Sequence, residues 1–149
     1  ILLSRQKLAV LDPDVFDTTA GPARGAYVLA DAPAPDIVIA ATGSEVHLAL
    51  EAQDSLRGRG TNARVVSVVS WELFAEQAAE YRRTVLSPPL PRLTVEAGVT
   101  SGWVGWETGN DAIGLDRFGA SAPGETVMQL LGFETERIVE AAETLVGKR

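Results

Sequence analysis

Apolar and polar positions along the chain switch repeatedly between two periods. Short, continuous apolar runs predict strands at 25–30 (GAYVLA), 37–41 (IVIAA), 63–69 (ARVVSVV) and 92–97 (RLTVEA), with a shorter edge strand at 112–115 (AIGL). Between these runs, apolar residues recur at helical spacing, which predicts helices at 45–58, near 71, at 79–86, from 123 to 132 and at 136–146. Strands that alternate with helices of this length form right-handed βαβ units. The pattern therefore predicts an α/β fold with a mostly parallel sheet of about five strands.

The connection between the first two strands is short and contains two prolines (DAPAPD, 31–36). A parallel crossover requires about a dozen residues or more. We therefore expect strands 25–30 and 37–41 to pair antiparallel, and the other strands to be parallel, with helices on both faces of the sheet. Two serines, Ser44 and Ser70, precede predicted helices and are expected to cap them.

Residues 12–24 show no period and are rich in Asp, Thr, Ala, Gly and Pro, as in a linker or a loop laid across a surface. Before them, the apolar run Ile1–Leu3 starts without an initiator methionine, and Arg5 follows at once. We therefore expect residues 1–24 to be a linker from a preceding domain and residues 25–149 to form the α/β domain. An arginine just past a strand is suited to bind an anion, although a solvated surface side chain explains it equally.

The bulk composition excludes several classes of function. A net charge of −7 with interspersed acids and bases argues against a nucleic-acid or anionic-membrane surface, and no apolar run approaches the roughly 20 residues of a membrane span. The chain has no cysteine and one histidine, His47, expected on an exposed helix flank. This excludes a zinc site of the usual His/Cys kind and Cys–His catalysis. The absence of cysteine fits a cytoplasmic protein.

Two turns before helices are candidate ligand sites. In ATGSEV, Gly43 and Ser44 lie where open α/β sheets bind ligands, between a strand and the positive end of a helix. In RFGASAPGE, the small residues Gly119–Gly124 precede another helix, with Arg117 nearby as a second anion contact. A simple capped turn explains each of them as well.

Trp103 and Trp106, in a glycine-rich loop, are either lids of the core or anchors of an interface. Several carboxylates lie near strand ends, but no spacing pairs two of them for acid–base chemistry: Glu72, Glu96, Glu107 and Asp116. From the residues alone we predict an α/β fold, and we predict no set of side chains arranged for catalysis.

Seven segments of the chain resemble the C-terminal domain of transketolase in order and spacing, from about Leu2 to the C-terminus. They are LSRQKLAVL, RGAYVL, DIVIAATGSEVHLALEA, ARVVSVVSWELFAEQAAEYRRTVL, LTVEAG, GLDRFGASAPGETVMQLLGF and the closing helix. Related thiamine-dependent enzymes share this domain type, but SRQ and DRFGAS favour transketolase. The resemblance implies a three-layer, Rossmann-like domain.

The resemblance also implies a larger enzyme. Two preceding domains would hold thiamine diphosphate and a divalent metal (Mg or Ca) at the interface of a homodimer. That enzyme moves a two-carbon ketol unit from a ketose phosphate to an aldose phosphate, using the carbanion chemistry of its cofactor. The present chain would then contribute structure, dimer contacts and contacts to the cofactor-binding domains, and would be inactive alone.

The family's diphosphate motif, its cofactor-activating glutamate and its active-site histidines have no counterpart here. We therefore expect no catalytic, cofactor-binding or metal-binding residue in this chain. The resemblance implies one substrate contact, from Arg5 of SRQ to the terminal phosphate of the sugar. Two alternatives stay open: a separately encoded interaction or regulatory subunit of a thiamine-dependent enzyme, and a small-anion-binding domain that uses one of the two turns.

Overall fold

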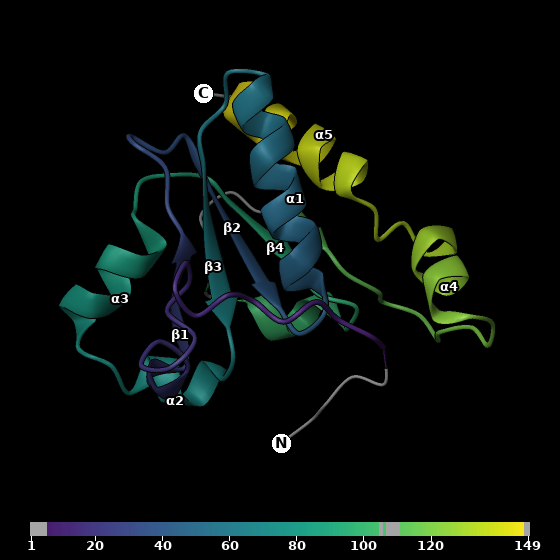
Figure 1. Cartoon of the computed structure of the whole chain (residues 1–149), viewed down its shortest axis with the longest axis horizontal. Coiled ribbons are helices and arrows are strands. Elements are labelled where there is room, and N and C mark those ends of the chain that lie inside the picture. The colour runs from purple at the N-terminus through teal and green to yellow at the C-terminus, as the bar shows by residue number, and fades with distance from the viewer. Residues whose placement is uncertain (1–5, 105, 107–110, 148–149) are drawn as a thin grey trace.

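The computed structural model describes residues 6–104, 106 and 111–147, which form a five-stranded sheet (Figure 1). The strands are β1 (Ala26–Ala30), β2 (Ile37–Thr42), β3 (Ala63–Val68), β4 (Arg92–Val95) and β5 (Asp111–Ile113). Their order across the sheet is β1-β3-β2-β4-β5, with β1 antiparallel to its neighbour and the other pairs parallel. The predicted α/β class, with a mostly parallel sheet and one antiparallel strand, is confirmed.

The predicted partner of β1 is wrong. β1 pairs with β3, where Ala26 lies opposite Val68. Both edges of β2 are occupied by parallel neighbours, since Ile39 lies opposite Val65 of β3 and Leu93 of β4. A short connection forces the chain to reverse direction, but it leaves room to pass over one strand position. β1 therefore runs opposite to β2, as expected, but lies beyond β3.

Helices cover both faces of the sheet and produce three layers (Figure 1). Helices α1 (Glu45–Gly58) and α5 (Thr135–Gly147) pack on one face, and α2 (Trp71–Ala75) and α3 (Ala79–Leu86) lie on the other. Successive β2 side chains point to opposite faces. Ile37 and Ile39 join an aliphatic core under α1 and α5, whereas Val38 joins a second core that contains Phe74 and Trp103.

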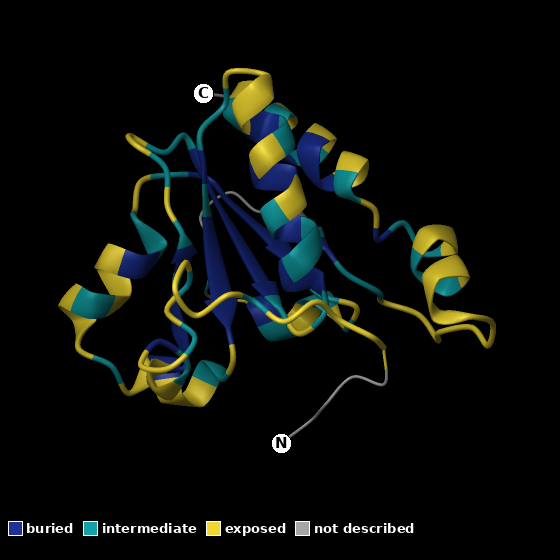
Figure 2. Ribbon diagram, in the orientation of Figure 1, coloured by how far each residue is buried: buried dark blue, intermediate teal, exposed yellow. Residues whose placement is uncertain are grey.

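Two short 3-10 helices and one outlying helix complete the fold: η1 (Pro22–Arg24), η2 (Thr100–Trp103) and α4 (Gly124–Leu130). Helix α4 contains no buried residue and stands at the side of the domain (Figures 1 and 2). Within the described residues, no helix is long and apolar enough to cross a membrane.

The two expected serine caps behave differently. Ser70 has an extended backbone and its Oγ accepts the N–H of Leu73 at 3.3 Å, so the predicted cap of α2 is confirmed. Ser44 does not cap α1 through its side chain, because its backbone is already helical (φ −67°, ψ −25°), whereas a capping residue has an extended backbone. Its hydroxyl donates to the Glu45 carboxylate.

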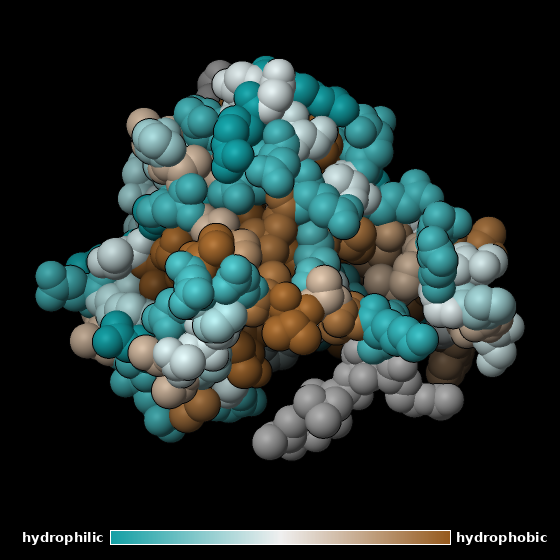
Figure 3. Space-filling view, viewed as in Figure 1, coloured by the Kyte–Doolittle hydropathy of each residue, from teal (hydrophilic) through white to brown (hydrophobic). Residues whose placement is uncertain are grey.

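The segment before the domain crosses the surface with most of its residues exposed (Figure 2). Leu11 and Phe16 pack against the aliphatic core, whereas Val10 is 94% exposed. Figure 3 shows apolar residues gathered over the middle of this face, where the segment crosses the domain. Such apolar exposure is typical of a surface that another protein surface covers.

Candidate functional site

The strand order places a topological switch point between β2 and β4, since the chain continues from β2 to β3 on one side and to β4 on the other. Open α/β sheets bind ligands at such a point, beyond the carboxyl ends of the strands. The turn at Gly43 leads from β2 into α1 at this position. Gly43 has a φ of +61°, a left-handed conformation that favours glycine.

Two carboxylates occupy this carboxyl edge of the sheet. Glu45 is only 4% exposed, and its Oε2 accepts the N–H of Ala97 at 3.0 Å. Glu96, the residue after β4, accepts the indole N–H of Trp103 at 2.9 Å. Burial raises the pKa of Glu96, the Trp103 hydrogen bond opposes this shift, and the charge of Glu45 adds to it. The edge is therefore acidic, which disfavours an anion at the ATGSEV turn.

Sequence reasoning missed this pair. Glu45 follows the turn after one strand and Glu96 follows another strand 51 positions later, so no local spacing joins them. Only the adjacency of β2 and β4 brings them together. The available signal was a glutamate within three residues of the end of each of two buried strands.

The tryptophans belong to the second core. Trp103 is 1% exposed and packs edge-to-face on Trp71 and Trp106, with ring centroids 5.4 and 5.6 Å apart. Trp106 stacks on Phe74 at 4.9 Å. Both tryptophans of the glycine-rich loop therefore act as lids of the core.

A cleft of about 500 Å³, here named the α1–α4 cleft, opens between α1, α4, the start of α5 and the N-terminal residues Gln6 and Leu8. It brings Ser44 and His47 together with Glu125 of the second candidate turn. Its ionisable lining consists of His47 and three carboxylates: Glu51, Glu125 and Glu134. His47 is half-buried here and not on an exposed flank as predicted. The cleft is acidic, like the carboxyl edge beside it.

The remaining sequence candidates do not converge on this cleft. Arg117 and residues 119–123 are exposed and do not line it. Glu72 and Asp116 are exposed acceptors: backbone N–H and hydroxyl hydrogen bonds lower the pKa of each carboxyl group. Arg5 and Glu107 lie outside the described residues.

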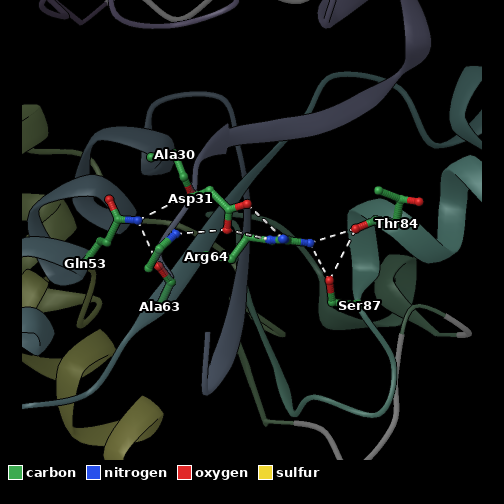
Figure 4. Close-up of polar contacts among 8 residues, drawn as sticks. Ala30, Asp31, Gln53, Ala63, Arg64, Thr84 and Ser87 are labelled. Atoms are coloured by element: carbon green, nitrogen blue, oxygen red, sulfur yellow. Dashed lines mark hydrogen bonds and ion pairs between the residues drawn. The ribbon is translucent and has the colours of Figure 1, made fainter. Parts of the chain in front are cut away.

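The opposite, amino edge of the sheet is built around Arg64, near the start of β3 (Figure 4). Its guanidinium donates two hydrogen bonds to the Asp31 carboxylate at 2.9 and 2.8 Å, one to the Thr84 carbonyl at 2.7 Å, and one to the Ser87 hydroxyl. Burial would raise the pKa of Asp31, but Arg64 holds it below its ordinary value. This network, here named the Arg64 clamp, fixes the end of α3 to β1 and β3.

The described residues do not fit a thiamine diphosphate or metal site. No group of three or more His, Cys, Asp or Glu side chains among them is arranged to hold a metal ion. The larger cleft is lined by carboxylates, which repel a diphosphate.

Residues 25–134 match the family model described as the transketolase-like TK C-terminal domain. The chain is 43% identical to a transketolase of Halalkalibacterium halodurans over 153 residues, covering 100% of this chain and 23% of that protein. It is 47% identical to a plasmid-encoded transketolase of Cupriavidus necator over 148 residues, covering 98% of this chain and 22% of that protein. The chain thus spans less than a quarter of the length of these relatives.

Solved structures agree with this match. A transketolase from Leishmania mexicana superposes with a TM-score of 0.81 at 38% identity, covering 86% of this chain and 19% of that one. A Pichia stipitis transketolase in complex with sedoheptulose 7-phosphate gives a TM-score of 0.80 at 38% identity, covering 85% of this chain and 18% of that one. A split-gene transketolase, an inactive β4 tetramer, shares the fold at 22% identity with a TM-score of 0.67, covering 93% of this chain and 46% of that one. This chain therefore belongs to the transketolase C-terminal domain family.

Proposed function

We propose that this chain works as the C-terminal domain of a transketolase, which transfers a two-carbon ketol unit from a ketose phosphate to an aldose phosphate. The observation that carries the proposal is the match of residues 25–134 to the family's C-terminal domain, at 43–47% identity to complete transketolases. The other parts of that enzyme, acting as a cytoplasmic homodimer, would hold thiamine diphosphate and a divalent metal. Thiamine diphosphate supplies the stabilised carbanion of ketol transfer when bound.

Within that enzyme we assign the chain a structural role and no catalytic one. Its described ionisable groups are engaged in local hydrogen bonds and ion pairs or lie on the surface, and they do not suit the cofactor. The exposed apolar residues of the linker, such as Val10 and Val15, are suited to pack against the cofactor-binding domains. We accordingly expect the isolated chain to be inactive.

We further propose that residues 1–24 link this domain to the preceding one, and that Arg5 binds the terminal phosphate of the sugar substrate. The support is the SRQ segment and the guanidinium fork, which matches phosphate oxygens. Holding the non-reacting phosphate would position the carbonyl end of the sugar for reaction.

The test of the proposed function is reconstitution. The cofactor-binding domains of a transketolase, thiamine diphosphate and Mg²⁺ are assayed for ketol transfer with the chain fused, with the chain added in trans, and without it. We expect activity to depend on the chain. Activity in trans would favour a separately encoded subunit, and activity that never depends on the chain would contradict the proposal.

Arg5→Ala in the fused enzyme tests the substrate contact. We expect kcat/KM to fall about 10-fold to 100-fold for phosphorylated acceptors, the range for a hydrogen bond to a charged group. Unphosphorylated acceptors should change little. Lys7→Ala removes a neighbouring positive charge and serves as the control. An equal loss of kcat/KM on both acceptor types would contradict the proposal that Arg5 binds the phosphate.

A further inference from the structure

A second pocket, of about 240 Å³, lies beside α3 at the amino end of β4. We name it the arginine pocket; its lining residues are Ala79, Arg82, Arg83, Leu86, Pro88 and Arg92. Half of these residues are arginine, and none of the described residues that line the pocket is a carboxylate. The chain has a net charge of −7, so a pocket whose described charged residues are all positive has the opposite charge to the molecule as a whole.

Several other arginines among the described residues form ion pairs with carboxylates. Examples are Arg57 with Asp54 at 2.9 Å, Arg59 with Glu136 at 2.8 Å and Arg64 with Asp31 at 2.8 Å. In the described part of the chain, no ion pair or side-chain hydrogen bond engages Arg82 or Arg83. Their neighbour Glu80 pairs with neither of them. Both guanidinium groups are therefore available to a ligand.

The helix that carries these two arginines is fixed in place. Arg82 and Arg83 lie three and four positions after Ala79, so all three share one face of α3. The Tyr81 hydroxyl donates to the Ala26 carbonyl at 3.0 Å, and the Arg64 clamp holds the Thr84 carbonyl (Figure 4). A site on a rigid element loses little conformational freedom when it binds.

The third arginine forms the buried part of the pocket. Arg92 is 7% exposed and is the first residue of β4, so the backbone that carries it is held in the sheet. Pro88 adds a rigid wall.

We propose that the arginine pocket binds a small dianion, either inorganic phosphate or the phosphate group of a small metabolite. The guanidinium groups of the two α3 arginines that line the pocket are planar forks of donors that match phosphate oxygens. The volume lies below the roughly 300–1,000 Å³ of sites for larger ligands, which fits one phosphate group and excludes a dinucleotide. This assignment does not depend on ketol transfer.

The test is isothermal titration of the 149-residue chain with inorganic phosphate at constant ionic strength, with chloride as the competing anion. The informative variant is Arg82→Gln combined with Arg83→Gln; both side chains are exposed, so folding is preserved. We expect at least about a tenfold loss of affinity in the double variant. Arg117→Gln, which removes an exposed arginine elsewhere, should change affinity less than about twofold. Lack of saturable binding, or equal loss in both variants, would overturn the proposal.

Two further arms identify the source of the anion. If glycerol phosphate binds more tightly than inorganic phosphate, the ligand is a phosphorylated metabolite. If the two affinities are equal, the ligand is free phosphate. Either result supports phosphate binding at the arginine pocket. The titration is then repeated on the chain assembled with the cofactor-binding domains. Binding that disappears on assembly would overturn the proposal, because the arginines would then serve a contact between domains.

Discussion

The carboxyl ends of β2 and β4 hold a buried carboxylate, Glu45, and a half-buried one, Glu96, whereas arginines lie at the amino ends of β3 and β4. Parallel sheets usually bind anions at the carboxyl edge, where helix N-termini point. In this domain acidic side chains lie at the carboxyl edge and arginines at the amino edge, so we expect an anion to bind at the amino edge. The acidic α1–α4 cleft lies beside the first edge and the arginine pocket lies at the second. The comparison indicates that the strand topology determines where a concave surface forms, whereas the side chains around that surface determine the charge of the ligand that it binds.

One of the two largest effects is expected at the amino edge, from Arg64→Ala. The substitution removes the donor that joins the Asp31 carboxylate to the Thr84 carbonyl, and it detaches the end of α3 from the sheet. We expect the free energy of unfolding to fall by about 1–3 kcal/mol, because the Arg64 side chain is only 14% exposed and loses its hydrogen bonds to Asp31, Thr84 and Ser87 together, although Asp31 is half exposed. Urea unfolding measures this loss of stability. The control Arg57→Ala removes an exposed pair and should cost less than about 1 kcal/mol. Equal losses would contradict a special role for the Arg64 clamp.

At the carboxyl edge, Trp103→Phe should be a comparable perturbation. It shortens a fully buried ring and removes the donor to Glu96. We expect a loss of about 1.5–3 kcal/mol from the combined cavity and lost hydrogen bond. Thermal and urea unfolding both report it. A loss below about 0.5 kcal/mol would show that the carboxyl edge is not held together by this contact.

The smallest effect, and the most specific, concerns Glu96→Gln. Glutamine keeps an acceptor for the Trp103 indole and removes the charge that burial and Glu45 disfavour. The pKa of Glu96 is raised in the folded state, so its contribution to stability is full below the unfolded pKa and is lost as the pH rises through the folded pKa. The variant should therefore gain stability relative to the parent as the pH rises above the ordinary glutamate pKa of about 4.3, by up to about 1 kcal/mol.

Glu72→Gln is the matched control for this pH dependence. Hydrogen bonds lower the pKa of Glu72, so its contribution is present above the unfolded pKa and is lost on acidification. Its removal should change stability with the opposite sign. Urea midpoints from pH 4 to pH 8 compare the two variants. The same sign in both would contradict the assignment of Glu96 as a disfavoured charge.

Much of the fold follows from local pattern. The buried strands are continuous apolar runs, and α5 was predicted within one residue at each end because Ile138, Ala142 and Leu145 repeat at helical spacing. The neighbour of β1 was not predictable in this way, because a connection length fixes direction and not strand order. The predicted cap at Ser44 was wrong because the backbone of Ser44 is already helical, which residue type alone does not reveal.

The candidate sites depend more on strand order than the fold does. Glu45 and Glu96 meet only because β2 and β4 are neighbours, and Arg92 reaches the α3 arginines only because β4 begins beside that helix. In the sequence, Arg82 and Arg83 are indistinguishable from a solvated helix face. Local periodicity carries no information on which exposed charges converge.

The reversal of charge between the two edges is tested most directly by a phosphate titration followed residue by residue with ¹H–¹⁵N NMR spectra of the chain. The structure predicts saturable shifts concentrated at Arg82, Arg83 and Leu86, with the turn at Gly43 and Ser44 unchanged. Larger shifts at Gly43 and Ser44 than at α3 would contradict it, because the helix terminus and not the arginines would then select the anion.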